Sequence, residues 1–286
     1  EVGSTSHLVL WDFIKENPFY RKPALVDMQP QEVVGLLLTV LMGISLGLIG
    51  AGGSILTVPI LVYLFQLPAS QATGASLVIV GSVALVGAIL AGQRGEVVAR
   101  AAILFGIPSV MTSFLVRRFL IPALPERLGP VNKDAAILIV FAALMLAAAY
   151  SMIRSKGDRR QTEGPAIQWI AAGFVAGLVT GVLGAGGGFL IVPALSMVMG
   201  LDMRKSVGTS LAIISMNSAV AFFADLLVRG APDWKLVGMI SFIAVGGLLV
   251  GARLRERFSQ SHLKMLFGWF VVAVAIFVLF KEAGHF

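Results

Sequence analysis

Residues 47–77 read GLIGAGGSILTVPILVYLFQLPASQATGASL, and residues 181–211 read GVLGAGGGFLIVPALSMVMGLDMRKSVGTSL. The second stretch aligns with the first without a gap and is identical to it at 13 of 31 positions. The identities gather in a Gly-Ala-Gly-Gly cluster followed by a proline, and in a later Gly-x-Ser-Leu block. Such a repeat predicts that each half of the chain is one structural unit that packs against its copy.

Composition identifies the class of protein. The chain has 286 residues, of which 57% are hydrophobic and 13% are charged, and its mean hydropathy is +0.91. Soluble domains carry about 25% charged residues, so the composition predicts a polytopic membrane protein. The net charge of +7 comes from basic residues in short loops between apolar spans, which is typical of membrane anchoring and not of nucleic-acid binding.

Residues that hold metals or redox groups are scarce. The chain has no cysteine, and its three histidines, His7, His262 and His285, fall outside the apolar spans. Thiolate sites and disulfides are therefore excluded. We expect no metal, no cofactor and no nucleic-acid partner.

Ten apolar spans follow a polar and aromatic N-terminal segment. They lie at about 33–49, 55–66, 72–91, 97–116 and 134–153, and at about 166–183, 189–199, 205–227, 235–252 and 264–280. We therefore divide the chain into an interfacial segment (1–31), a first transmembrane repeat (32–153), a basic linker (154–165) expected in the cytoplasm, and a second repeat (166–286). The predicted fold is all-α, with about eight transmembrane helices.

The second span of each half is too short to cross a membrane, because a crossing helix needs about 20 residues. Either the glycine cluster breaks one long helix, or it forms the tip of a V-shaped hairpin. A hairpin gives three crossings per half and inverted halves, whereas a broken helix gives four crossings and parallel halves. The 22 Lys and Arg residues divide 12 to 10 between the two faces in both arrangements. We favour the inverted arrangement, in which two glycine tips meet near the midplane.

The repeated motif predicts an anion site. Irregular backbone at membrane depth is tolerated where it is buried in protein or lines a cavity, and a helix that starts there offers unpaired N–H groups and a positive dipole end. Hydroxyl groups in the later block can also donate to an oxyanion. The predicted binding residues are Gly52, Gly53, Ser54, Thr73, Gly74 and Ser76 in the first half, and Gly186, Gly187, Gly188, Gly208, Thr209, Ser210 and Asn217 in the second.

The glycine clusters and Asn217 each have an alternative role. Glycine clusters also allow membrane helices to pack closely, and a membrane asparagine such as Asn217 can form a hydrogen bond between helices. The proline that follows each cluster and the second block at the same spacing favour binding, because packing requires neither.

Ionisable residues are almost absent from the spans. No Lys or Arg lies in the middle of a span. Asp225 lies near the end of span 205–227, and Arg229, four residues later, is its expected partner in a local ion pair. The predicted site is therefore formally neutral. A membrane enzyme would need titratable groups at membrane depth, so we expect a transporter with no catalytic residues.

The motifs Gly47-x-x-Gly50-Ala51-Gly52-Gly53 with Pro59, and their second copy with Pro193 and the block 208–211, make the chain resemble the TauE/SafE family of sulfite and organosulfur-anion exporters. The resemblance covers about residues 32–281. It implies a multi-pass transporter in a bacterial or archaeal cytoplasmic membrane, with a small sulfur-containing oxyanion such as sulfite or sulfoacetate as its partner, besides the lipid bilayer.

Uptake, or a channel for another small inorganic anion, is the alternative function, and the oligomeric state is left open. The two copies differ at Ser54 against Gly188 and at Ala75 against Thr209. The two half-sites are thus predicted to be chemically unequal.

Overall fold

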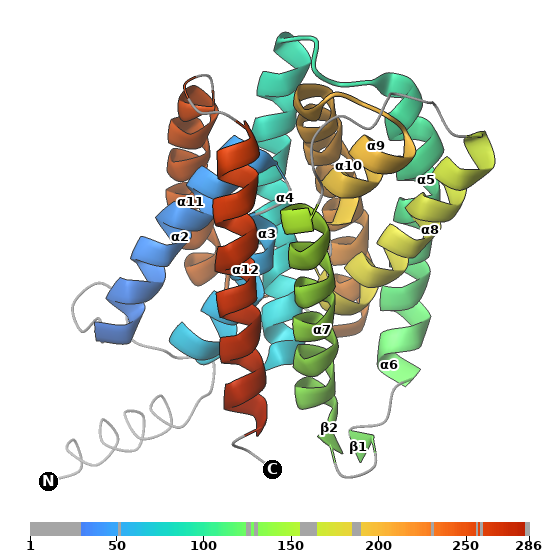
Figure 1. Ribbon diagram of the computed structural model, residues 1–286. Coiled ribbons are helices and arrows are strands. Elements are labelled where there is room, and N and C mark those ends of the chain that lie inside the picture. Colours follow the sequence, from blue (N-terminus) through green and yellow to red (C-terminus); the bar gives the residue numbers. More distant parts are fainter. Residues whose placement is uncertain are drawn as a thin grey trace, which may run out of the picture.

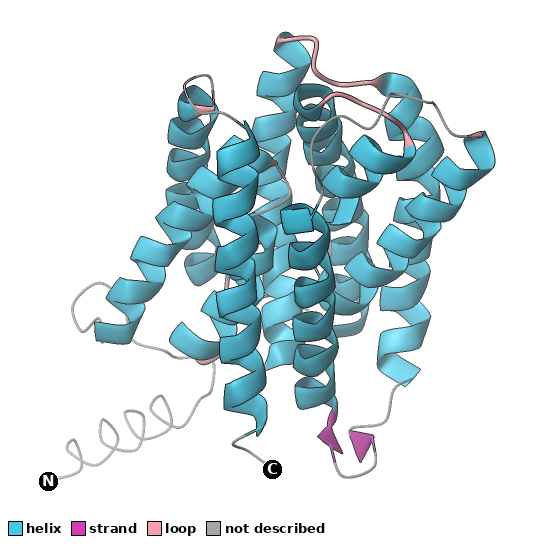
Figure 2. Ribbon diagram, viewed as in Figure 1, coloured by secondary structure: helices cyan, strands magenta, loops and turns pink. Residues whose placement is uncertain are grey.

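The computed structural model describes residues 30–50, 53–123, 127–128, 131–154, 165–184, 190–229, 232–255, 257 and 260–283. The predicted interfacial segment, except for its last two residues, and the basic linker, except for its two end residues, lie outside this part of the chain. Within it nearly everything is helix, with one very short strand pair (Figure 2).

The elements of the first half are α2 (Pro30–Ile49), α3 (Ser54–Pro59), the π-helix η2 (Ile60–Leu64), α4 (Ala69–Gln93), α5 (Ala99–Leu115), the π-helix η3 (Val116–Leu120), α6 (Ile121–Ala123), the hairpin β1 (Arg127–Leu128) and β2 (Val131–Asn132), and α7 (Lys133–Arg154). Those of the second half are α8 (Ala166–Leu183), α9 (Ile191–Val198), α10 (Met203–Arg229), α11 (Trp234–Leu254) and α12 (Gln260–Ala283). Each predicted span thus corresponds to a helix or a helix pair (Figure 1).

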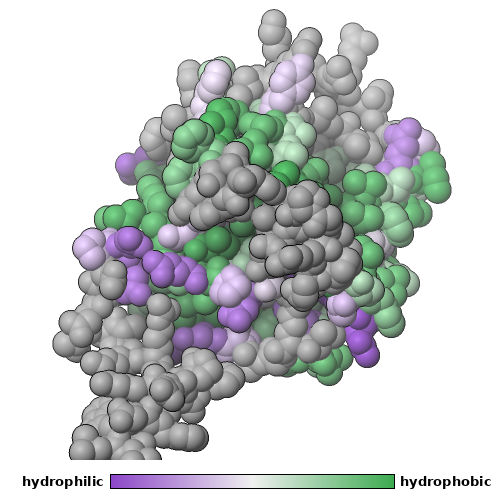
Figure 3. Space-filling model, turned by 90° about the horizontal axis from the view of Figure 1, so that it is seen from below, coloured by the Kyte–Doolittle hydropathy of each residue, from purple (hydrophilic) through white to green (hydrophobic). Residues whose placement is uncertain are grey.

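The surface suits a bilayer. In the described part of the chain, six helices are long and apolar enough to cross a membrane, namely α2, α4, α5 with its extension to Ala123, α8, α10 and α11. Large apolar side chains such as Phe242 and Phe280, each 82% exposed, point outward. Seen from below, hydrophobic residues form patches at the upper left and on the right-hand side of the molecule (Figure 3). Contiguous apolar surface of this kind marks contact with lipid, so the polytopic all-α prediction is confirmed.

Gly50 and Gly53, the first and last residues of the first glycine cluster, lie at the end of α2 and the start of α3, which form a hairpin. Thr57 in α3 donates a hydrogen bond to the sulfur of Met42 in α2, at 2.9 Å. Phe65, after η2, lies against Gly35 near the start of α2. The return segment therefore runs antiparallel to α2 and ends on the face where α2 began, which is the V-shaped arrangement. Helices α8 and α9 turn back on one another in the same way from the opposite face (Figure 1).

Helices from the two halves pack crosswise. Helix α2 packs against α11, and α8 packs against α5. Both crossings are close, since a methyl group on Gly43 or on Gly177 would lie within 3.0 Å of the backbone of Ala244 or Ser109 respectively. Small residues that let helix backbones approach are the usual device of membrane helix packing.

The two central helices, α4 and α10, run in opposite directions along one another. Near one end of the contact Gly74 faces Asp225, at its middle Gly81 faces Ser218, and near the other end Gly87 faces Leu211. As residue numbers rise in α4 they fall in α10, so the crossing is antiparallel. Because each of these helices carries one copy of the Gly-x-Ser-Leu block, the two copies run in opposite directions through the molecule.

The copies also share unusual backbone conformations. Gly50 and Gly184, which begin the two glycine clusters, have φ angles of 85° and 76°. Gln66 and Gly200, which are also aligned with one another in the repeat, have φ angles of 54° and 65°. Left-handed conformations are uncommon outside glycine, and their recurrence at matched positions shows that the sequence repeat is accompanied by similar local geometry.

Candidate functional site

Four residues meet where the second hairpin tip reaches the start of α4. A methyl group on Gly184 would lie 2.8 Å from the hydroxyl of Ser76 and 3.0 Å from Nη2 of Arg117, and it would be closer still to the carbonyl of Thr73. Arg117 Nη1 also donates to the hydroxyl of Thr73 at 3.4 Å. We call Thr73, Ser76, Arg117 and Gly184, together with Asp225, the Arg117 half-site.

The Arg117 half-site contains a buried ion pair. Arg117 is 1% exposed, and its Nη1 lies 3.3 Å from Oδ1 of Asp225, whose side chain is 10% exposed. Burying two charges together requires good pairing, because each loses its hydration. The pair joins η3 at the end of α5 to the far part of α10, so it connects the two halves of the chain.

This pair corrects one prediction from the sequence. The expectation that no arginine lies within a span was wrong, because the helix that was predicted to end at residue 116 continues through η3 to Ala123 and carries Arg117 with it. The site is therefore not free of formal cations. Asp225 has a partner from another helix, whereas the side chain of Arg229, its expected partner, lies outside the described residues.

The other hairpin tip meets the second Gly-x-Ser-Leu block in a related way. A methyl group on Gly50 would lie 3.0 Å from the hydroxyl of Ser210. The neighbouring Thr209 accepts a hydrogen bond from the backbone N–H of Val98 at 2.9 Å. We call Gly50, Val98, Thr209 and Ser210 the Ser210 half-site. Each half-site thus combines the tip of one half with the hydroxyl block of the other.

The two half-sites are separate. One touches α10 at Ser210, near the start of that helix, and the other touches it at Asp225, near its end. The helical rise of about 1.5 Å per residue places these two positions roughly 20 Å apart. The described residues of the two half-sites therefore contact α10 near opposite ends of that helix.

Of the remaining predicted binding residues, some lie inside the first hairpin, one lies beside Asp225, and others fall outside the described residues. Gly53 lies inside the first hairpin, where a methyl group would come within 3.0 Å of Met42 and Leu46, and Ser54 is fully buried at the start of α3. Helix α3 has only six residues, so its dipole is short. Gly74 lies against Asp225, beside the Arg117 half-site. Gly52, Gly186, Gly187 and Gly188 lie outside the described residues.

Asn217 takes the structural role that the sequence left open. Its amide nitrogen donates to the hydroxyl of Ser109 in α5 at 2.5 Å, and both side chains are fully buried. It lies near the middle of the contact between α4 and α10, between the two half-sites. The amide therefore forms a hydrogen bond between helices, which is the alternative role that the sequence offered for it.

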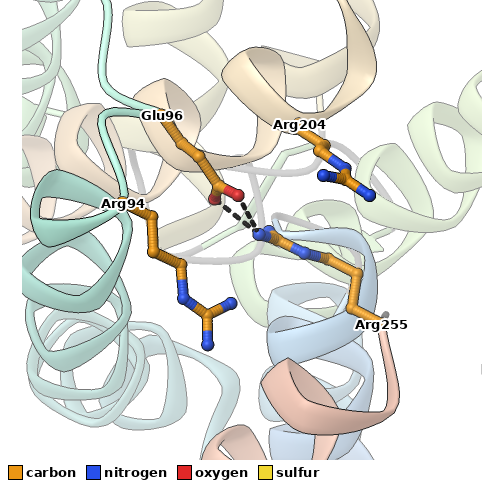
Figure 4. A pocket seen from close by; sticks show the side chains of 4 residues that line it. All are labelled: Arg94, Glu96, Arg204 and Arg255. Atoms are coloured by element: carbon orange, nitrogen blue, oxygen red, sulfur yellow. Dashed lines mark hydrogen bonds and ion pairs between the residues drawn. The ribbon is translucent and has the colours of Figure 1, made fainter. Parts of the chain in front are cut away.

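A third group of functional interest lies in a cavity of about 280 Å³ that is lined by Arg94, Glu96, Arg204 and Arg255. Figure 4 shows these side chains, which come from the loop after α4, the start of α10 and the end of α11, with Glu96 and Arg255 pointing toward one another. The sequence suggested membrane anchoring for the basic loop residues in general, with a role at an anion's entry as the less favoured interpretation of Arg94, and no spacing along the chain relates these four. In the described part of the chain, no cluster of three or more His, Asp or Glu residues could hold a metal ion.

Comparison with known proteins agrees with the geometry. The protein family described as "Sulfite exporter TauE/SafE" matches residues 35–278. A probable membrane transporter protein of Xylella fastidiosa (strain 9a5c) is 30% identical over 254 residues, which cover 85% of this chain and 92% of the relative. A probable membrane transporter protein of Bacillus subtilis (strain 168) is 26% identical over 230 residues, covering 80% and 92%.

A eukaryotic relative is similar over a shorter region. Sulfite exporter TauE/SafE family protein 3 of Arabidopsis thaliana is 29% identical over 128 residues, which cover 44% of this chain and 26% of the relative. No solved structure matches the chain. With the family match covering most of its length, and with helices that suit a bilayer, this chain belongs to the TauE/SafE family of membrane transporters.

Proposed function

We propose that this protein is a secondary transporter that exports a small sulfur oxyanion, sulfite or a sulfonate such as sulfoacetate, across the cytoplasmic membrane. The observation that carries the proposal is Arg117, a buried arginine that reaches a hydroxyl of one half and the glycine tip of the other. Ionisable groups at membrane depth are costly and mark substrate pathways. A guanidinium beside hydroxyl groups supplies the donors that an oxyanion accepts.

The arrangement of the halves supports alternating access. We infer that they form inverted repeats, because α4 and α10 cross antiparallel and the hairpins enter from opposite faces. In transporters built from inverted repeats, one half rocks against the other and exposes a site to each side in turn. The two half-sites, about 20 Å apart along α10, would then be offered to the anion in succession.

Charge balance explains how a buried cation is kept without substrate. Asp225 neutralises Arg117 in the structure described here. An arriving oxyanion would share the guanidinium with Asp225. The hydroxyls of Thr73 and Ser76, which donate to the carbonyls of Ser70 and Thr73 in the structure, would turn and donate to the anion. The site would therefore bind its substrate by exchanging one set of acceptors for another, which is favourable only for a ligand that is itself negatively charged.

Flux of sulfite into liposomes tests this function. The variant Thr73→Val keeps the shape of the side chain and removes its hydroxyl, and a lost hydrogen bond to a charged ligand costs about 1.5–3 kcal/mol, so kcat/KM for sulfite should fall at least tenfold. Thr39→Val is the matched control, because Thr39 is equally buried and donates only to Gly35 within its own helix.

Two results would contradict the proposal. One is a wild-type protein that moves no sulfur oxyanion, or moves it without saturation and without competition between sulfite and sulfoacetate, as a channel would. The other is equal flux through the Thr73→Val and Thr39→Val variants. Loading the liposomes on one side only separates export from uptake.

A further inference from the structure

The cavity beside the Ser210 half-site is strongly basic. Arg94, Arg204 and Arg255 line it with one carboxylate, Glu96, so these side chains carry a formal charge of +2. The volume of about 280 Å³ falls just below the range of roughly 300–1,000 Å³ that holds drug-sized ligands. A cavity of this size and charge suits a small anion together with several water molecules.

One acceptor already occupies part of this basic cavity. Nη2 of Arg255 lies 2.6 Å from Oε1 and 2.5 Å from Oε2 of Glu96. The two side chains are only 9% and 13% exposed, so water screens the pair less than it would at an open surface. Figure 4 shows the end of Arg204 beside this pair, and the side chain of Arg94 extending past the pair with its guanidinium below it. The carboxylate therefore lies where the guanidinium groups would hold an anion.

The loop that carries Glu96 also covers the Ser210 half-site. Glu96 lies against Gly208, since a methyl group there would be 2.7 Å from the Glu96 carbonyl. Two residues further on, the N–H of Val98 donates to Thr209. A movement of Glu96 away from Arg255 would therefore pull on the hydrogen bond that covers this half-site.

We propose that this cavity is a second anion-binding site, an access vestibule for small multivalent oxyanions, in which Glu96 is a built-in competitor for Arg255. An oxyanion that binds to Arg94 and Arg204 displaces the Glu96 carboxylate from Arg255 and loosens the loop over Thr209. The vestibule deepens the proposed transport function and rests on it for the identity of the anion. The Arg117 half-site, which contacts the other end of α10, is closed to solvent by comparison, because the side chains of its ion pair are buried.

Binding of sodium sulfate to the purified protein in phosphatidylcholine nanodiscs tests the vestibule directly, with sodium chloride at the same ionic strength as the reference. Arg204→Gln and Arg94→Gln remove a positive charge at exposed positions and should weaken sulfate binding about five- to tenfold. Glu96→Gln removes the competing carboxylate and should tighten it several-fold. Arg253→Gln is the matched control, since it removes an exposed charge two residues from Arg255, outside the cavity, and should change the affinity less than twofold.

Three results would overturn the assignment. If Glu96→Gln weakens sulfate binding, the Glu96 carboxylate stabilises the loop after α4 and does not compete with the anion for Arg255. If Arg204→Gln and Arg253→Gln behave alike, the cavity does not bind the anion. If sulfate binding disappears when phosphatidylglycerol partly replaces phosphatidylcholine, the cavity holds lipid headgroups and not a free anion. Thermal unfolding of the Arg94→Gln and Arg204→Gln variants should match that of the wild type, which excludes misfolding as the cause of weaker binding.

Transport separates a failure of this inference from a failure of the proposed function. Wild-type sulfite flux with the same KM in Arg204→Gln and Arg253→Gln would disprove the vestibule and leave the function intact. Sulfate binding with the expected pattern of variants, in a protein that moves no sulfur oxyanion, would disprove the function and leave the vestibule intact.

Discussion

At the scale of single residues, the two hairpin tips depend on glycines that no other residue can replace without strain. Gly50 and Gly184 both have positive φ angles, a conformation that costs other L-residues roughly 1 kcal/mol or more. Their surroundings differ in tolerance. A methyl group on Gly50 would lie 3.0 Å or more from its neighbours, Val207 and Ser210, whereas one on Gly184 would lie closer than this to the backbone carbonyl of Thr73.

The substitution Gly184→Ala should therefore be more damaging than Gly50→Ala. We expect it to lower the free energy of unfolding by about 1–3 kcal/mol through backbone strain, and to reduce sulfite flux at least tenfold. Gly246→Ala is the control, because a methyl group there meets nothing within 4 Å and should stabilise α11 by up to about 1 kcal/mol. Thermal unfolding and liposome flux measure both effects, and an order of stability with Gly184→Ala above Gly50→Ala would contradict this account.

At the scale of secondary-structure elements, the π-helix η3 explains why sequence reasoning missed the buried arginine. Hydropathy ends a span where two adjacent arginines, Arg117 and Arg118, begin. The helix continues, and one of the two turns inward, to 1% exposure, while the other lies on the surface. π-Helical turns are frequent at functional sites. Nothing in the local sequence shows which of the two arginines pairs with Asp225, which lies 108 residues further along the chain.

Removing one member of this ion pair should cost more than removing both. Arg117→Met takes the guanidinium away from the buried Asp225 carboxylate, so the free energy of unfolding should fall by about 3–5 kcal/mol. The double variant Arg117→Met with Asp225→Leu replaces the pair with apolar packing, and should recover most of that stability. Sulfite transport should stay lost in both variants, because the cation is absent.

An exposed pair provides the comparison for the buried one. Lys205 and Asp202 lie 3.7 Å apart with side chains 52% and 45% exposed, so Lys205→Met should cost less than about 1 kcal/mol. Normal transport by the double variant at Arg117 and Asp225 would remove the buried arginine from the proposed mechanism.

The helices themselves were predictable. Most apolar spans ended within a few residues of a helix, with span 97–116 as the exception, and the shortness of the spans after the glycine clusters predicted either a broken helix or a hairpin at each cluster. Apolar length fixes such boundaries because the bilayer, unlike water, leaves a backbone few alternatives to a helix. Contacts across the molecule have no comparable signal, so the crossing of α2 with α11 and the separation of the two half-sites appeared only in three dimensions.

At the scale of the whole molecule, the distribution of Lys and Arg residues could not decide whether the two halves run parallel or inverted through the membrane. Lys and Arg residues divide almost evenly between the faces in either arrangement, so the loops carry no decisive bias. The antiparallel contact of α4 with α10, from Gly74 facing Asp225 to Gly87 facing Leu211, supports the inverted arrangement.

Single cysteines test the inverted arrangement, since the natural chain has none. Ala99 and Lys235 are exposed at the starts of α5 and α11, which are corresponding helices of the two halves. In cells, Ala99→Cys and Lys235→Cys should react with a membrane-impermeant maleimide from opposite sides. Ala123→Cys, at the end of α6, should react from the same side as Lys235→Cys. Labelling of residues 99 and 235 from one side would mean that the halves are parallel.

The crosswise packing of α2 with α11 also affects how the protein is made. Gly43 and Gly47 lie against Ala244 and Leu248, so the first long helix of the described chain to leave the ribosome is packed by one that is synthesised near the end of translation. Until then its row of glycines faces lipid without a partner. Contacts this distant along the chain slow folding, and partly assembled intermediates are prone to mispairing. The first hairpin therefore stays undocked until α11 has been synthesised, and the packing of α2 against α11 is a late step of assembly.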